Sequence, residues 1–178
     1  MKPVFLFLAF LFLLLAPKAQ AQSIGQVKLG DRVFSTELPP WQEDQEPEMM
    51  SEERLEIALD CIRKTFGKIQ EYKEYYGECC GKHHFDVILE SGDELGFEEG
   101  ILNDFNLVSP LFPAAKEWFK GGLRVGKTPP QPNDDSIDII PWEKDPNRVF
   151  FNKNGLGGSY YLDTDGTIIA IYVGESEC

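Results

Sequence analysis

Apolar residues recur every three or four positions between residues 55 and 66, the spacing of one buried face of an α-helix. Ser51 stands where an N-cap is expected, and Glu52 and Glu53 place negative charge in the first turn, where the helix dipole favours it. Gly67 is suited to end the helix because glycine readily adopts the conformations that follow a last turn. The pattern therefore predicts a helix from Glu52 to Phe66.

The apolar spacing continues after Gly67, at Ile69, Tyr72 and Tyr76. Because these positions again lie three or four residues apart, we expect a second helix from about Lys68 to Tyr76. The two segments then form a helical hairpin, and the aromatic side of the second helix is expected to pack into the core.

Two apolar segments near the C-terminus, Gly158 to Leu162 and Thr167 to Val173, are separated by an Asp-Gly turn. This arrangement is typical of a β-hairpin. The second segment is almost continuously apolar, so we expect a central strand with both faces covered. Further strands are predicted at Phe85–Glu90, Ile137–Ile140 and Val149–Phe151, and a helix at Pro113–Lys120.

Together these elements predict an α+β fold, in which an N-terminal helical hairpin packs on a small, mostly antiparallel sheet that ends in a C-terminal β-hairpin. Residues 51–178 are expected to form this single domain. Residues 22–50 mix Gly, Pro and acidic residues and predict an extended acidic arm.

Residues 1–21 have the pattern of a secretory signal peptide. Lys2 gives a positive start, Val4 to Leu15 form an unbroken apolar run, and Ala19-Gln20-Ala21 places small residues at the cleavage positions. This run is shorter than the roughly 20 residues that a membrane-spanning helix needs, and no later segment approaches that length. We therefore expect an exported protein, periplasmic or secreted, with no integral membrane segment after cleavage.

Acidic residues outnumber basic ones by 30 to 17, and the formal net charge is −13. Lys2 and Lys18 lie in the predicted signal peptide, so residues 22–178 keep 15 basic residues and a formal charge of −15. Nucleic acids bind basic surfaces, so this charge argues against a nucleic-acid partner. A basic protein partner is favoured because opposite charges accelerate encounter, although acidity also keeps an exported protein soluble.

The 4 cysteines, an even number in a chain expected to be exported, predict two disulfides with three possible connectivities. A straight helix through Cys61 would hold this residue too far from the adjacent cysteines Cys79 and Cys80 for a disulfide. A break in the helix at Gly67 removes this obstacle. We expect Cys61 to bond one member of the pair and Cys178 the other. The disulfide candidates are Cys61, Cys79, Cys80 and Cys178.

Cys80 and His83 also have a spacing found in zinc sites, but exported thiols oxidise and no second pair of ligands completes a tetrahedral site. The stretch from Gly121 to Thr128 matches the phosphate-binding pattern G-x-x-x-x-G-K-[ST], yet two prolines follow where that loop needs a helix. Asp163-x-Asp165-Gly166 lacks the spacing of a calcium loop and is interpreted as a turn. No metal, cofactor or catalytic residue is therefore predicted.

Two motifs combine glycine with tyrosine. Phe66-Gly67 is followed by Tyr72-Lys73-Glu74-Tyr75-Tyr76, and Gly157-Gly158-Ser159-Tyr160-Tyr161-Leu162-Asp163 is followed by Gly166 to Tyr172. The first resembles the early helix-turn-helix of the SUKH superfamily, and the second is similar to its Gly-rich hairpin. Members of that superfamily bind partners and often act as bacterial toxin-immunity proteins. The resemblance implies a binding fold and no catalytic residues.

These features predict an exported, acidic, disulfide-containing binding protein, such as an immunity protein or inhibitor that acts on a basic protein partner. The alternative is a small exported hydrolase in which His83 or His84 acts as general base. That alternative requires one imidazole to line a pocket near a Ser, Cys or carboxylate.

Overall fold

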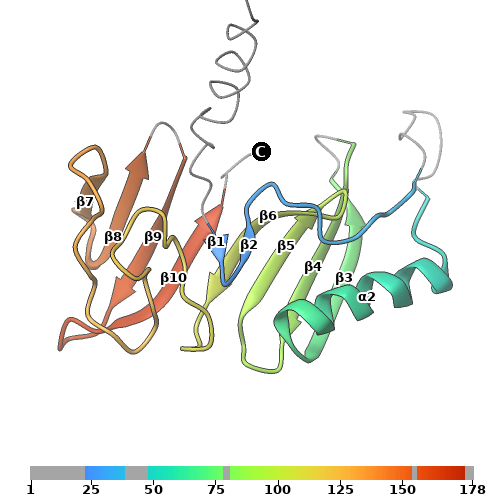
Figure 1. Cartoon of the computed structure of the whole chain (residues 1–178), viewed down its shortest axis with the longest axis horizontal. Coiled ribbons are helices and arrows are strands. Elements are labelled where there is room, and N and C mark those ends of the chain that lie inside the picture. Colours follow the sequence, from blue (N-terminus) through green and yellow to red (C-terminus); the bar gives the residue numbers. More distant parts are fainter. Residues whose placement is uncertain (1–22, 39–47, 78–80, 154–155, 175–178) are drawn as a thin grey trace, which may run out of the picture.

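The computed structural model describes residues 23–38, 48–77, 81–153 and 156–174 (Figure 1). This part of the chain contains helix α2 (Glu52–Phe66) and the short hairpin strands β1 (Ser23–Ile24) and β2 (Val27–Lys28). The other strands are β3 (Ile69–Tyr76), β4 (His83–Leu89), β5 (Glu94–Glu98), β6 (Ile101–Leu107), β7 (Asp138–Trp142), β8 (Asp145–Lys153), β9 (Leu156–Leu162) and β10 (Ile168–Gly174).

The eight longer strands form one antiparallel sheet in the order β3-β4-β5-β6-β10-β9-β8-β7. Its two halves are consecutive four-stranded meanders, β3 to β6 and β7 to β10, which pair through their last strands. Ile171 of β10 lies opposite Leu107 of β6, and Tyr172 lies opposite Asn106. Strands that are distant in the sequence therefore join the halves into one continuous sheet (Figure 1).

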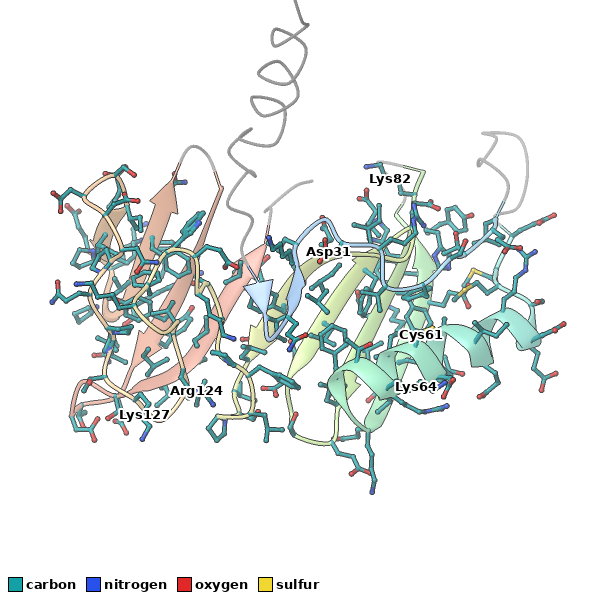
Figure 2. All side chains as sticks on the ribbon, viewed as in Figure 1. Asp31, Cys61, Lys64, Lys82, Arg124 and Lys127 are labelled. Atoms are coloured by element: carbon teal, nitrogen blue, oxygen red, sulfur yellow. The ribbon has the colours of Figure 1, made fainter. Side chains whose placement is uncertain are left out.

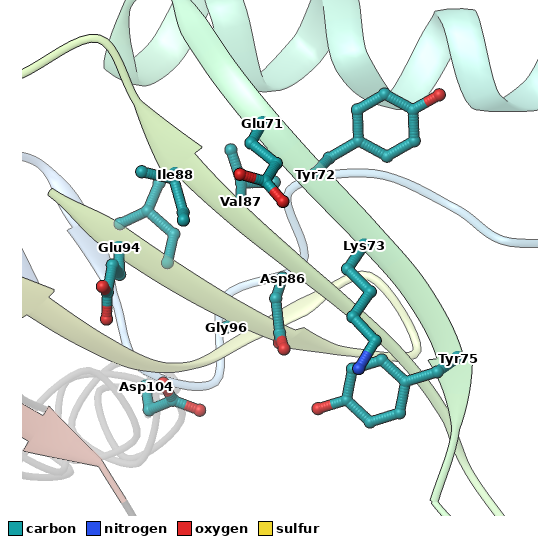
Figure 3. A pocket seen from close by; sticks show the side chains of 11 residues that line it. Glu71, Tyr72, Lys73, Tyr75, Asp86, Val87, Ile88, Glu94, Gly96 and Asp104 are labelled. Atoms are coloured by element: carbon teal, nitrogen blue, oxygen red, sulfur yellow. The ribbon is translucent and has the colours of Figure 1, made fainter. Parts of the chain in front are cut away.

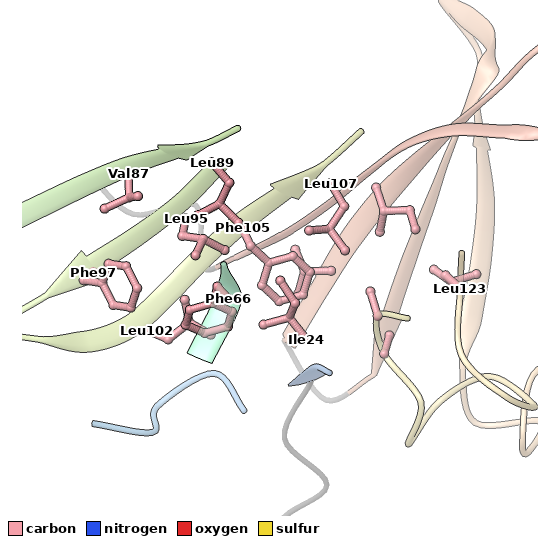
Figure 4. Packing of buried hydrophobic residues seen from close by; sticks show 14 of the residues in the cluster. Ile24, Phe66, Val87, Leu89, Leu95, Phe97, Leu102, Phe105, Leu107 and Leu123 are labelled. Carbon is pink, nitrogen blue, oxygen red and sulfur yellow. The ribbon is translucent and has the colours of Figure 1, made fainter. Parts of the chain in front are cut away.

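One face of this sheet is covered, and successive residues of a strand point alternately toward it and away from it. Helix α2, the β1–β2 hairpin and the irregular segment 108–136 supply the covering side chains, as the apolar layer in Figure 4 shows. The rings of Phe66 and Phe97 lie 6.4 Å apart in the first half, and those of Trp118 and Phe151 lie 5.9 Å apart in the second. We call this the covered face and the opposite one the open face.

Helix α2 has the bounds that the apolar spacing predicts. The Ser51 hydroxyl accepts a hydrogen bond from the Arg54 backbone N–H, and Gly67 donates its N–H to the Arg63 carbonyl at a positive φ of 107°. The buried residues of the helix are Ala58, Leu59, Ile62 and Phe66, so its core-facing stripe is also confirmed.

The predicted helical hairpin is wrong, because residues 69–76 form strand β3 and not a second helix. The spacing of the apolar positions in this segment predicted a helix. Only a strand, however, brings the tyrosine rings beside the rings of Phe85 and His84 on β4. Tyr72 stacks on Phe85 with centroids 5.5 Å apart, and Tyr75 stacks on His84 at 5.2 Å. Such cross-strand aromatic pairs stabilise a sheet and here outweigh local helix propensity.

The sheet has eight strands and is therefore much larger than the small one expected. The described residues contain a single helix. The C-terminal hairpin is confirmed as β9 and β10, and β10 is a central strand. Its open face is only partly covered, however, since Ala170 and Tyr172, which alternate with buried Ile171 and Val173, are half-buried. Residues 113–120 form turns and isolated bridges in place of the predicted helix, and Ala115 has a positive φ of 50°.

Residues 22–50, predicted as an extended arm, contribute Ile24 and Phe34 to the core. The acidic stretch 39–47 and the predicted signal peptide lie outside the described residues. No helix that the structure describes has the length and apolar character to cross a membrane.

The fully buried carboxylate of Asp93 fixes the turn between β4 and β5 to the end of β6. One oxygen accepts the backbone N–H groups of Val108 and Ser109, each at 2.8 Å, and the other accepts the hydroxyls of Ser91 and Ser109. Charged groups of this kind are buried only when they are fully hydrogen-bonded.

Asp93→Ala should lower the free energy of unfolding by roughly 2–4 kcal/mol, because it leaves buried donors without an acceptor. Urea unfolding at neutral pH measures this change. Ser91→Ala is the matched control: it removes a single half-buried donor and should cost about 1 kcal/mol or less. Equal losses in the two variants would contradict the role assigned to Asp93.

Candidate acidic pocket on the open face

A hollow of about 410 Å³ lies on the open face over strands β3 to β6. We call it the acidic pocket. Figure 3 shows Lys73, Tyr75 and Asp86 extending from neighbouring strands on one side, whereas Tyr72 turns toward α2. Four carboxylates and one ammonium group belong to its lining, which contains Glu71, Lys73, Tyr75, Asp86, Glu94 and Asp104 among its polar residues.

A glycine makes room for the carboxylates at the centre of the pocket. Asp86 of β4 lies opposite Gly96 of β5, and Gly96 lies opposite Asp104 of β6, so the three residues form one row across the sheet. A Cβ atom at Gly96 would lie 2.7 Å from the carboxyl carbon of Asp104, closer than real Cβ atoms approach. The absent side chain therefore lets Asp104 lean over β5 toward Asp86.

Both aspartates carry charge that is costly to keep there. Burial raises the pKa of Asp104 above its usual value, and the neighbouring Asp86 carboxylate raises it further. Burial also raises the pKa of Asp86, although a hydrogen bond from Tyr75 and attraction to His84 and Lys73 oppose this shift. A cation that entered the pocket would offset the repulsion between the two carboxylates.

The two histidines, which were the candidate general bases, point to opposite faces of β4. His83 is fully buried on the covered face, where its Nε2 atom lies 2.7 Å from a carboxylate oxygen of Glu74. That oxygen also accepts the backbone N–H of Met50 at 2.7 Å. His84 is half-buried on the open face and stacks on Tyr75, beside the acidic pocket. The structure therefore leaves His84 as the imidazole near both a pocket and a carboxylate.

Cys61 lies half-buried on α2 (Figure 2). Its candidate partners Cys79, Cys80 and Cys178 lie outside the described residues, so both predicted disulfides stay predictions. Where side chains are described, no group of three or more His, Cys, Asp or Glu residues is placed to hold a metal ion.

Sequence reasoning did not single out Asp86 or Asp104. A signal for the first was present, because polar and apolar residues alternate from His84 to Val87 and place Asp86 opposite to the buried side. Asp104 carried no comparable signal. An irregularity in the β5–β6 pairing between Gly96 and Phe97 sets its register, and such a bulge is not visible in the residue pattern.

No family model, no curated protein and no solved structure matches this chain. The resemblance to the SUKH superfamily therefore stays a prediction from its two motifs. The function of the pocket has to be inferred from its own geometry and charge.

The raised pKa values of Asp86 and Asp104 predict how pH affects stability. A carboxyl group whose pKa is higher in the folded than in the unfolded state binds protons more tightly when folded, so its contribution to stability falls as pH rises through that interval. Asp104→Asn removes this loss and also removes the repulsion between the carboxylates of Asp104 and Asp86. The variant should gain stability relative to the unmodified protein as pH rises from about 4 to about 7.

Urea unfolding of both proteins across this range measures the difference. Asp135→Asn is the control, since it removes an exposed carboxylate outside the pocket. The prediction would be contradicted if the stability of Asp104→Asn relative to the unmodified protein decreased as pH rises.

Proposed function

We propose that this chain is an exported, acidic binding protein that receives a cationic side chain of a basic protein partner in the acidic pocket. Inhibition of a basic toxin or hydrolase is one role of this kind. The observation that carries the proposal is a hollow on an uncovered sheet face in which four carboxylates are accompanied by a single lysine.

The chemistry of the pocket supports a cation as the bound group. The row Asp86–Gly96–Asp104 holds two half-buried carboxylates whose pKa values are raised by burial. Arginine or lysine from a partner would provide charge-assisted hydrogen bonds to both, and these are stronger than neutral ones. The net charge of −13 favours encounter with the same class of partner.

Affinity capture with the purified protein as bait tests this proposal. Capture is compared between the unmodified protein, the double variant Asp86→Asn with Asp104→Asn, and a control that loses the same charge elsewhere, Asp135→Asn with Glu143→Gln. A basic partner should be retained by the unmodified and control baits and lost at high salt. The pocket variant should bind it on the order of tenfold more weakly.

The affinity of the captured partner should also decrease as pH falls toward the raised pKa values of the two aspartates, because protonation removes the charge that binds it. The proposal would be overturned if the pocket variant retained the partner as strongly as the unmodified protein does. Recovery of no protein with any bait would also overturn it.

The position of His84 favours hydrolysis as the second candidate function. His84 stacks on Tyr75, and Tyr75 hydrogen-bonds Asp86, so an imidazole lies beside two residues that line the pocket, one of them a carboxyl group. The general-base role predicts loss of hydrolytic activity in His84→Ala, by roughly 100-fold or more, in a screen of ester, peptide and glycoside substrates. His83→Gln is not a suitable control because His83 is buried, and Lys82→Gln serves instead. Unchanged activity in His84→Ala would eliminate His84 as the general base.

A further inference from the structure

Arg148 of β8 is held in place on the open face of the second half of the sheet. Its Nε group donates a hydrogen bond to the Ser159 hydroxyl at 3.3 Å. Its guanidinium carbon lies 4.6 Å from the ring centroid of Phe150, 5.1 Å from that of Tyr161 and 5.2 Å from that of Trp142. Three aromatic rings and one hydrogen bond therefore orient the side chain from several directions.

The terminal nitrogens of Arg148 have no acceptor among the residues that the structure describes. The other arginines do: Arg54 and Arg63 bind carboxylates, and Arg32 and Arg124 donate to backbone carbonyls. The exception is notable in a chain with 30 acidic residues. A planar guanidinium that is already oriented and half-buried is suited to bind a carboxylate through two parallel hydrogen bonds.

The surroundings of Arg148 have the composition of a protein-binding surface. Trp142 is 37% exposed, and Ile140 on the same strand is 57% exposed. Tryptophan, tyrosine and arginine are the residue types that contribute most to binding at protein interfaces, and apolar neighbours exclude water from their contacts.

This surface is continuous with the acidic pocket. Tyr172 lies on central strand β10, and its pKa is raised by burial and by Asp104 and lowered by Arg148, so it is within electrostatic reach of both charges. Asp104 stands on β6 and Arg148 on β8, separated by β10 and β9. The register places Phe105, next to Asp104, in one row with Phe151, so Asp104 also lies about four residues along the strand direction from Arg148. Three strand spacings and this offset together amount to roughly 20 Å, a distance that one docking segment of a partner can span.

We propose that Arg148, with Trp142, Phe150 and Tyr161, is a second binding site that receives a carboxylate of the partner. As a statement about one partner this rests on the proposed function: the partner presents a cationic side chain to the acidic pocket and an acidic residue, flanked by apolar ones, to Arg148. Its recognition segment is therefore bipolar, and net basic charge alone does not select it.

The carboxylate site is tested directly with a peptide probe and the isotope-labelled full chain. The probe is the tripeptide N-acetyl-Leu-Glu-Leu-amide, and the matched probe replaces Glu with Gln. The Nε–H signal of Arg148 and the indole N–H signal of Trp142 are followed by NMR during titration. The Glu peptide should shift both signals saturably, and the Gln peptide should bind roughly tenfold more weakly.

Three variants complete the experiment. Arg148→Gln should abolish binding, Arg148→Lys should retain a weaker contact without the bidentate geometry, and Arg63→Gln should bind like the unmodified protein because it removes an exposed arginine from α2. Equal affinities for the Glu and Gln peptides would overturn the proposal, as would no saturable shift up to about 10 mM peptide. An Arg148-dependent dimer in sedimentation would also overturn it, because a second copy of the chain would then occupy the site.

The outcome is separable from that of the proposed function. The capture experiment leaves Arg148 intact in every bait, whereas the peptide carries no cation for the pocket to bind. If the peptide binds but no partner is captured, the carboxylate site at Arg148 stands and the proposal of a basic partner fails. If a partner is captured but the peptide does not bind, the acidic pocket stands as the recognition site and the proposal for Arg148 fails.

Discussion

The pairing of β6 with β10 is the interaction on which the rest of the structure depends. It joins two four-stranded meanders at their last strands, with Ile171 opposite Leu107 and Gly174 opposite Asp104. Because these strands are central, the apolar side chains of both halves form one buried layer. The same pairing brings Asp104 of the first meander and Tyr172 of the second together on the open face.

The contrast between the two faces of the sheet explains where chemistry can occur. The covered face is closed by α2, the β1–β2 hairpin and residues 108–136, so polar groups there serve the fold, as Asp93 and His83 do. On the open face, carboxylates lie in a hollow over one half, and a guanidinium lies among aromatic rings over the other. Opposite charges at two ends of a single surface favour a partner whose own charges are arranged to match.

Local signals predicted the elements that depend on neighbours in the chain. Helix α2 follows from its apolar spacing, the Ser51 cap and Gly67, and the C-terminal hairpin follows from an Asp-Gly turn between β-forming segments. The spacing of Ile69, Tyr72 and Tyr76 fits one helix face, yet the segment forms strand β3. Contacts of Tyr72 and Tyr75 with rings on β4 stabilise the strand, and these contacts exist only when the two strands pair in the folded chain.

The amino-acid sequence alone determined the acidic charge, the helix, the final hairpin and the absence of a recognisable catalytic motif, since each depends on composition or on residues close together in the chain. Only the tertiary structure decided that His83 is buried and His84 stacks on Tyr75 beside the pocket, that Gly96 admits Asp104 beside Asp86, and that Arg148 meets three aromatic rings. These relations depend on which strands pair and in what register, and a one-residue shift in register would turn each side chain to the other face.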